Sequence, residues 1–268
     1  MSNGISAAGA AAATNNDVSF PPVVELRRYR LHPGARETLI ELFDREFVET
    51  QEEVGMRVLG QFRHLDDPDS FVWLRGFPDM PSRADALGAF YGGPVWAAHQ
   101  QAANATMIDS DDVLLLRPTL DCEIVSALAS ERPAPGTGGD GFGLVVATIL
   151  HLDPEGPLDV FARLFESEAR PRIAAAGGDI VGTFVTESGP NTFPRLPVRE
   201  GERVLVTLAR YPDSVHHDRV RELLGGDPLW RDRVWPELWS HLVREPEVLR
   251  LEPTARSLMQ GSSPPRSA

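Results

Sequence analysis

The stretch Gly76-Phe77-Pro78-Asp79 recurs as Arg210-Tyr211-Pro212-Asp213, and this recurrence decides the fold of the 268-residue chain. After each stretch come a short helical segment and a glycine pair that leads to a tryptophan, at residues 91–96 in the first half and 224–230 in the second. Upstream, residues 58–62 (VLGQF) match residues 180–184 (IVGTF) in the same order. Ordered matches of this kind rarely arise by chance, so the sequence predicts a tandem duplication.

Both halves have the hydrophobic pattern of a β-α-β-β-α-β unit. The first helix of the first half carries a stripe at helical spacing, formed by Leu39, Ile40, Phe43, Phe47 and Val48. Strands are expected at residues 23–31, 57–65, 70–77 and 113–117, with a closing helix at 96–107, and again at residues 144–152, 180–187, 203–211 and 247–254. Such a unit forms a four-stranded antiparallel sheet with both helices on one face. We therefore expect an α+β fold of two ferredoxin-like repeats whose bare sheet faces cover each other.

The domain boundaries follow from composition. Residues 130–141 contain Pro133, Pro135 and a cluster of glycines, which is typical of a linker. The first domain is therefore expected at residues 20–129 and the second at 142–256. Residues 1–19 and 257–268 are rich in small and polar residues, which predicts disordered tails.

The composition excludes several classes of function. A net charge of −13 repels a phosphate backbone, so we expect no nucleic-acid partner. The chain contains no lysine, which excludes Schiff-base and pyridoxal phosphate chemistry and a Walker A loop. Its one cysteine, Cys122, lies between Asp121 and Glu123, where the acidic neighbours disfavour a reactive thiolate.

The sequence also contains no motif for a metal, a cofactor or a membrane. No stretch approaches 18 apolar residues, and the N-terminus lacks the regions of a signal peptide. There is no HExxH, GxSxG or dinucleotide-binding pattern and no metal-spaced set of histidines and acids. We therefore expect a cytoplasmic protein without cofactor or metal, whose partners are a small-molecule substrate and, in a homodimer, a second copy of the chain.

The first half resembles the NIPSNAP family of the dimeric α/β-barrel superfamily. The resemblance rests on residues 24–34 (VELRRYRLHPG) and on a block from Pro94-Val95-Trp96 through the strand at residues 113–118. The second copy lacks the Glu-Leu-Arg strand and the equivalents of His99 and Asn104. The resemblance implies the fold. It also implies kinship with small-molecule enzymes, since the superfamily includes cofactor-free monooxygenases and haem enzymes, although a fold does not fix a function.

The first strand carries its polar candidate residues on one face. Glu25, Arg27 and Tyr29 alternate with Val24 and Leu26. If Leu26 faces the helices, the polar row faces the barrel interior, where Arg27 would bind an enolate or carboxylate and Tyr29 would donate a hydrogen bond. The alternative interpretation is a Glu25–Arg27 ion pair that holds the sheet together.

Other candidate residues surround this row. His99 on the closing helix is the best candidate for proton transfer, because imidazole titrates near neutrality; the alternative is a packing histidine. A set with aromatic and polar side chains is expected to bind the substrate, with packing, helix capping or surface exposure as the alternative: His64, Phe71, Trp73, Arg75, Asn104 and Met107.

Three hypotheses remain open. The first is an enzyme of bacterial secondary metabolism that binds an aromatic or polyketide-like molecule in the barrel of the first half and catalyses proton transfer, isomerisation or oxygenation without a cofactor. The second is a binding or scaffold protein without catalysis. The third is a haem protein with His99 or His241 as the iron ligand.

Overall fold

The computed structural model describes residues 22–119 and 131–262, so the expectations for residues 1–19 and for Cys122 lie outside the described residues. The first half consists of β1 (Val23–Leu31), α1 (Arg36–Leu42), the π-helical turn η1 (Phe43–Phe47), α2 (Val48–Glu53), β2 (Arg57–His64), β3 (Ser70–Phe77), α3 (Met80–Tyr91), α4 (Pro94–Asn104) and β4 (Met107–Pro118). The second half repeats this order with β5 (Leu144–His151), α5 (Leu158–Leu164), η3 (Phe165–Ala169), α6 (Arg170–Ala175), β6 (Asp179–Thr186), β7 (Val204–Tyr211), α7 (Ser214–Gly226), η4 (Trp230–Val234), α8 (Trp235–Trp239) and β8 (Glu247–Pro253).

The repeat is visible in the helix caps. Asp79 begins α3 by accepting a hydrogen bond from the Ser82 backbone N–H at 2.6 Å. Asp213 begins α7 in the same way, from the backbone N–H of His216 at 2.9 Å. A carboxylate at this position satisfies a backbone donor that has no partner within the helix, which explains why both copies place an aspartate there.

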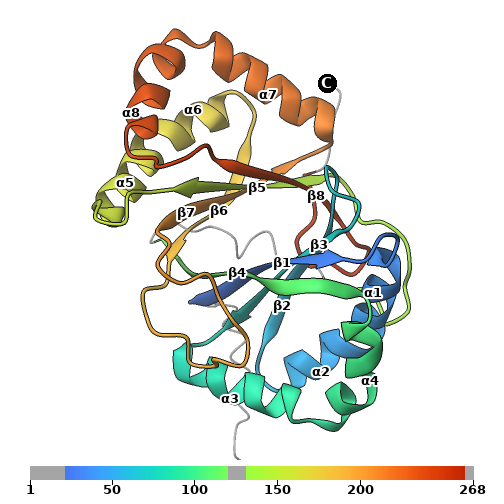
Figure 1. Ribbon diagram of the computed structural model, residues 1–268. Coiled ribbons are helices and arrows are strands. Elements are labelled where there is room, and N and C mark those ends of the chain that lie inside the picture. The colour runs from blue at the N-terminus through green and yellow to red at the C-terminus, as the bar shows by residue number, and fades with distance from the viewer. Residues whose placement is uncertain (1–21, 120–130, 263–268) are drawn as a thin grey trace, which may run out of the picture.

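The two sheets join into one closed antiparallel barrel. Its strand order is β1-β3-β2-β8-β5-β7-β6-β4, with β4 paired to β1. The halves meet at two seams, where β2 pairs with β8 and β4 pairs with β6. Figure 1 shows the helices of each half on the outer side of its own sheet, at opposite ends of the molecule. The expected arrangement of two ferredoxin-like repeats in a dimeric-α/β-barrel manner is confirmed.

The barrel interior is a packed apolar core. Val24 and Leu26 of β1 point into it and meet residues such as Phe62 from β2 and Phe184 from β6. Since successive side chains of a strand point to opposite faces, Glu25, Arg27 and Tyr29 face the helices. The expectation that this row faces the barrel interior is wrong. The apolar residues take that place because the interior of the closed barrel offers no water and few polar partners.

The seam between β2 and β8 is covered by the linker and the C-terminal segment. Arg132 of the linker donates to Val58 O at 2.6 Å, and Arg256 donates to Pro133 O at 2.9 Å. Leu258 and Met259 pack into the barrel core. Residues 257–262 were expected in a disordered tail, and this expectation is wrong because their apolar side chains complete the core.

Ion pairs between the halves close one end of the barrel, where the apolar rows end. Arg28 of β1 donates to Asp112 Oδ2 at 2.6 Å, and its Nη1 lies 3.3 Å from Glu247 Oε2 of β8. Arg199 lies 3.2 Å from Asp112 and 3.5 Å from Glu247. His151 Nε2 lies 2.8 Å from Glu247 Oε1. Glu247 and Asp112 are therefore carboxylates that connect both halves at this end.

The loop between β6 and β7, at residues 187–203, reaches across to the first half. Figure 1 shows it (orange) running from the second sheet to α3. Thr192 donates to Met80 O at 3.1 Å, and Phe193 stacks on Tyr91 with 6.1 Å between the ring centroids. The loop thus adds apolar cover to the helix layer of the first half.

Candidate functional site

The polar row of β1 forms a buried cluster between the first sheet and its helices. Glu25 accepts hydrogen bonds at 2.7 Å from Arg27 Nη1, from Arg75 Nε and from Arg83 Nε. Arg27 Nε also donates to Tyr29 Oη at 3.1 Å. These five side chains come from β1, β3 and α3, and none is more than 7% exposed.

The charges in this cluster depend on one another. Burial by itself would raise the pKa of Glu25, but the guanidinium groups of Arg75, Arg27 and Arg83 outweigh burial and hold this pKa far below its ordinary value. Burial raises the pKa of Tyr29, so the phenol stays protonated. The cluster is therefore a fixed set of ionised groups, with Glu25 as the shared partner of three arginines.

Aromatic rings fill the rest of this layer. Trp73 lies 4.8 Å from Phe43 and 5.9 Å from Tyr29 between ring centroids, and Phe71 packs beside them. The remaining void, next to Met107, measures about 30 Å³. That space suits one water molecule. This void in the sheet–helix layer of the first half is therefore too small for a substrate.

The other predicted residues lie apart from this cluster or at its edge. His99 on α4 is about one-third exposed, with Nε2 3.5 Å from Glu46 Oε2. Asn104 is exposed at the end of α4. His64 is buried at the end of β2, 4.0 Å from Asp66, and burial lowers its pKa. The structure does not bring His99 or His64 to Arg27. The catalytic roles assigned to Arg27 and His99 and the substrate-binding role assigned to His64 stay predictions.

The second half has a cavity of about 620 Å³ at the equivalent place, between its sheet and its helices. We call it the second-half cavity. Its floor is the outer face of β5, β6 and β7, and its walls come from η3, α6, α7 and the η4–α8 segment. The floor residues are Val146, Thr148, Leu150, Ile180, Thr207, Ala209 and Tyr211, and the aromatic wall residues are Phe165, Trp230 and Trp235.

Strand register explains why one half is filled and the other is hollow. Glu25 pairs with Arg75 across β1 and β3, and Val146 pairs with Ala209 across β5 and β7. Two residues further along β1 and β5, on the same face, Arg27 pairs with Trp73, whereas Thr148 pairs with Thr207. Val, Ala and Thr thus stand where the first half has Glu, two Arg and Trp. The smaller side chains leave the space that becomes the cavity.

A few polar groups face this apolar cavity. Thr148 and Thr207 lie opposite each other on the floor, and neither hydroxyl hydrogen-bonds to any residue that the structure describes. Tyr211 on the floor and His217 on the α7 wall lie 5.1 Å apart between ring centroids, in an edge-to-face arrangement. An apolar chamber with a small number of polar groups is the usual character of a site for an organic molecule.

Burial shifts the pKa values of Tyr211 and His217 in opposite directions. It raises the pKa of Tyr211 to about 12, with Asp179 adding to the effect. Burial lowers the pKa of His217. The charge of Asp218 opposes this shift, and the charges of Arg221 and Arg250 add to it. At neutral pH Tyr211 is therefore a hydrogen-bond donor and His217 is a neutral imidazole able to accept a proton.

The mouth of the cavity is charged and includes the first half. Asp66, from the turn between β2 and β3, accepts a hydrogen bond from Arg250 Nε of β8 at 2.9 Å. Asp218 and Arg221 of α7 line the same cavity, as does Val248, which is 46% exposed. The positive and negative groups at the mouth balance, so the entrance has no strong preference for one sign of charge.

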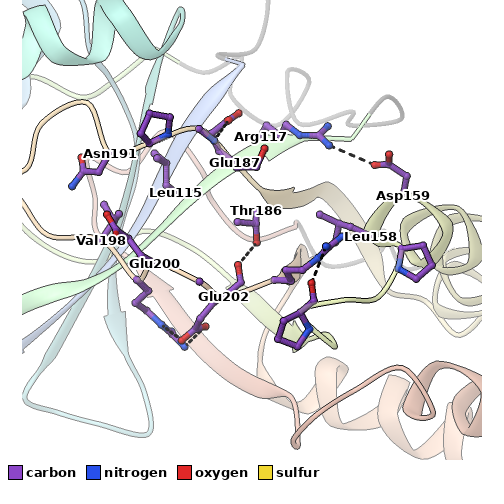
Figure 2. Close-up of a pocket in the computed structure, with 18 of the residues that line it drawn as sticks. Leu115, Arg117, Leu158, Asp159, Thr186, Glu187, Asn191, Val198, Glu200 and Glu202 are labelled. Carbon is purple, nitrogen blue, oxygen red and sulfur yellow. Dashed lines mark hydrogen bonds and ion pairs between the residues drawn. The ribbon is translucent and has the colours of Figure 1, made fainter.

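A second hollow of about 990 Å³ lies on the outer surface at the seam between β4 and β6 (Figure 2). We call it the seam groove; it is bordered by α5 and by the loop at residues 187–203. Figure 2 shows its charged residues pairing with each other, as Arg117 does with Asp159 at 3.5 Å. The groove is open, and part of its charge is already matched by the pairs Arg117–Asp159 and Arg199–Glu202, which makes it a weaker candidate than the second-half cavity.

Neither a metal centre nor a membrane span is found in the described part of the chain. Among residues 22–119 and 131–262, no group of three or more histidines, cysteines and acids is placed to hold a metal ion. No helix of that same part is long and apolar enough to cross a bilayer.

Sequence reasoning missed the residues of the second-half cavity. In the sequence, Tyr211 marks only the repeat, and no role is predicted for His217. The signal was present in the repeat itself, because His217 follows the capping Asp213 by the same number of residues as Arg83 follows Asp79. A position-by-position comparison of the two copies would have found it.

The comparisons with known proteins agree with this architecture. The NIPSNAP family model matches residues 24–123, and no curated protein matches the chain. A candidate monooxygenase from Lactobacillus acidophilus has a TM-score of 0.51 at 12% identity and covers 89% of this chain and 97% of its own. One from Fusobacterium nucleatum has a TM-score of 0.54 at 9% identity, covering 87% and 92%. An anthrone oxidase-like protein has a TM-score of 0.57 at 12% identity, covering 91% and 98%. At these identities the likeness concerns the fold alone, whereas the family match identifies one half: residues 24–123 of the chain form a NIPSNAP domain.

Proposed function

We propose that the protein is an enzyme that binds an aromatic organic molecule in the second-half cavity and carries out proton transfer, isomerisation or oxygenation on it. The site is thus assigned to the second half instead of the barrel of the first. The observation that carries the proposal is the contrast between about 620 Å³ of space in the second half and about 30 Å³ at the equivalent place in the first.

The character of the walls favours an aromatic ligand. Trp230 and Trp235 lie nearly parallel at 6.0 Å between ring centroids, and Phe165 adds a third ring. Aromatic walls bind flat rings through dispersion and quadrupole contacts. The candidate monooxygenases and the anthrone oxidase-like protein share this fold over most of their length, which supports chemistry on an organic substrate as an analogy.

The first half acts as a rigid support in this proposal. Its equivalent layer is filled by the Glu25 cluster and by aromatic rings, and its Asp66 reaches the mouth of the cavity in the other half. A rigid scaffold keeps a site in one geometry, which lowers the entropic cost of binding. The two halves thus have different tasks although they share one fold.

The test is to fill the cavity with the residue of the first half. Thr207→Trp places an indole where the first half has Trp73, and Thr207→Val keeps the space as a matched control. Binding is measured by fluorescence of N-phenyl-1-naphthylamine, a neutral aromatic probe. We expect the wild type and Thr207→Val to bind it and Thr207→Trp to lose at least about tenfold in affinity, or 1.4 kcal/mol.

A second control separates the two hollows. Val160→Trp changes a side chain that is 47% exposed in the seam groove and lies away from the second-half cavity. It should leave probe binding unchanged. If Val160→Trp abolished binding and Thr207→Trp did not, the seam groove would be the binding site and the proposal would be wrong.

A further inference from the structure

We infer that His217 is the general base and Tyr211 the oxyanion donor of the second-half cavity, and that the ligand is a polycyclic phenol or an enolisable aromatic ketone. This inference rests on the proposed function and names the substrate class of the same site. It starts from the position of His217, whose imidazole lines the cavity and makes no hydrogen bond to the sheet among the described residues.

Arg83 shows what this position does in the first half. Its Nε donates to Glu25 Oε1 at 2.7 Å, and its Nη1 donates to Asn191 at 3.0 Å. In the second half, Val146 replaces Glu25, so His217 has no carboxylate on the sheet to bind. His217 is only 5% exposed, and its Nδ1 makes no hydrogen bond within the described residues. Asp218 Oδ1, at 3.4 Å, is the one acid beside this nitrogen in the described part of the chain, and the ring lines the cavity, so a ligand can supply the hydrogen bond that the sheet does not.

The charged groups around His217 leave the imidazole neutral but do not shield it from the cavity. On its own helix, Asp218 Oδ1 lies 3.4 Å from Nδ1, and Arg221 lies one turn further along. Arg250 of β8 and Asp66 of the first half face it across the mouth and pair with each other. Among the residues that the structure describes, no cation donates a hydrogen bond to the ring, and Asp218 is the one acid that pairs with it. The ring can therefore accept a proton from a ligand.

Tyr211 completes the pair from the sheet. Its ring meets His217 edge to face, and its hydroxyl hydrogen-bonds to nothing in the described residues although it borders the cavity. An acid that loses its proton to His217 leaves a negative oxygen, and the protonated phenol of Tyr211 is a donor for that oxygen.

The chemistry of the ligand follows from this arrangement. The O–H bond of a phenol, or the C–H bond next to a ketone, breaks; the proton binds the imidazole of His217, and the electron pair stays on the ligand as a phenolate or enolate. Only a ligand whose anion carries its charge on oxygen uses the Tyr211 donor. The aromatic walls select a flat ring system, and the hydroxyls of Thr148 and Thr207 on the floor can bind its further oxygens.

The experiment uses 4-nitro-1-naphthol, whose phenolate absorbs visible light, and its methyl ether, which has no proton to lose. Absorbance titration of the bound naphthol gives its apparent pKa on the full-length protein. In the wild type we expect this pKa to lie about one unit, or tenfold, below the value in buffer. His217→Gln and Tyr211→Phe should each reduce the shift at least about threefold in proton affinity, while the methyl ether binds all three proteins equally.

The outcomes separate the inference from the proposed function. If the naphthol binds and Thr207→Trp blocks it, but His217→Gln leaves the pKa shift intact, the cavity is a binding site and the role of His217 is wrong. If neither probe binds the wild type, or Thr207→Trp has no effect, the proposed function falls and the inference falls with it. His217→Asn serves as a second variant, and circular dichroism checks that each protein is folded.

Discussion

Arg83 and His217 occupy equivalent positions, each four residues beyond the aspartate that begins its helix, but only Arg83 has a carboxylate on the sheet to bind. The difference lies on the sheet, where Glu25 in one half corresponds to Val146 in the other. Arg83 has thus become part of a buried ion cluster, and His217 borders the second-half cavity. The two copies of a duplicated chain can diverge in this way because one copy can maintain stability while the other changes.

Removal of the shared carboxylate should strongly destabilise the protein. Glu25→Gln leaves Arg27, Arg75 and Arg83 buried without a counter-charge, which costs about 3–5 kcal/mol. Urea unfolding followed by circular dichroism measures this loss. Glu37→Gln is the matched control, since Glu37 is 53% exposed and its pair with Arg63 should contribute less than about 1 kcal/mol. Equal effects of the two variants would contradict the central role of Glu25.

Opening the first half should create a second cavity. Trp73→Thr removes a side chain that is 2% exposed, which should cost about 3–5 kcal/mol because the surrounding rings cannot fill the space. Indole has the shape of the lost group, so it should raise the Tm of this variant by several degrees while leaving the wild type unchanged. Trp239→Thr, at a site 41% exposed, should show neither effect. A variant that indole did not rescue would indicate that the layer collapses instead of staying open.

The stability of the barrel end that the ion pairs close should depend on Glu247. Its carboxylate faces Arg28, Arg199 and His151, and although burial raises its pKa, the charges of Arg28, Arg199 and His151 lower it below the ordinary value. Because the side chain is 25% exposed, solvent screens the network, and Glu247→Gln should cost about 1–2 kcal/mol in urea unfolding. Glu245→Gln, which alters an exposed neighbour, should be neutral. Loss of this difference at high salt would support an ionic origin.

His217 should make stability depend on pH. Its pKa is lowered in the folded protein, so the unfolded chain binds its proton more readily. The stability gained by burying neutral His217 is fully present above its unfolded pKa of about 6.5 and is lost as the pH falls through the folded value. The free energy of unfolding should therefore fall between pH 7 and pH 5, with a contribution of up to about 1.4 kcal/mol per pH unit from this residue.

The measurement for this pH effect is a comparison of wild type with His217→Gln. Burial raises the pKa of Asp44 to about 6, and this group titrates with the opposite sign within the same window. Its contribution is common to both proteins and cancels in the difference. The variant should show a flatter pH dependence than the wild type, and identical slopes would mean that His217 has the same proton affinity in both states.

Local sequence patterns determined the architecture of this protein. The strand at Val23–Leu31 has the predicted bounds, and the repeated Pro-Asp stretches mark the starts of two helices that the structure contains. These features depend on alternation, capping and turn residues, which act between neighbours in the chain. The duplication was readable for the same reason, since both copies preserve those short-range signals.

Only the tertiary structure decided which face of each strand is inside and which half is hollow. Alternation along β1 shows that Glu25 and Leu26 point to opposite sides, but both sides are buried here, one by the closed barrel and one by helices. Likewise, the size of a cavity depends on the sum of side-chain volumes contributed by β5, β7, α7 and α8, segments far apart in the chain. Packing of this kind is a property of the assembled layers, so the sequence could predict the fold and leave the place of the candidate site to the structure.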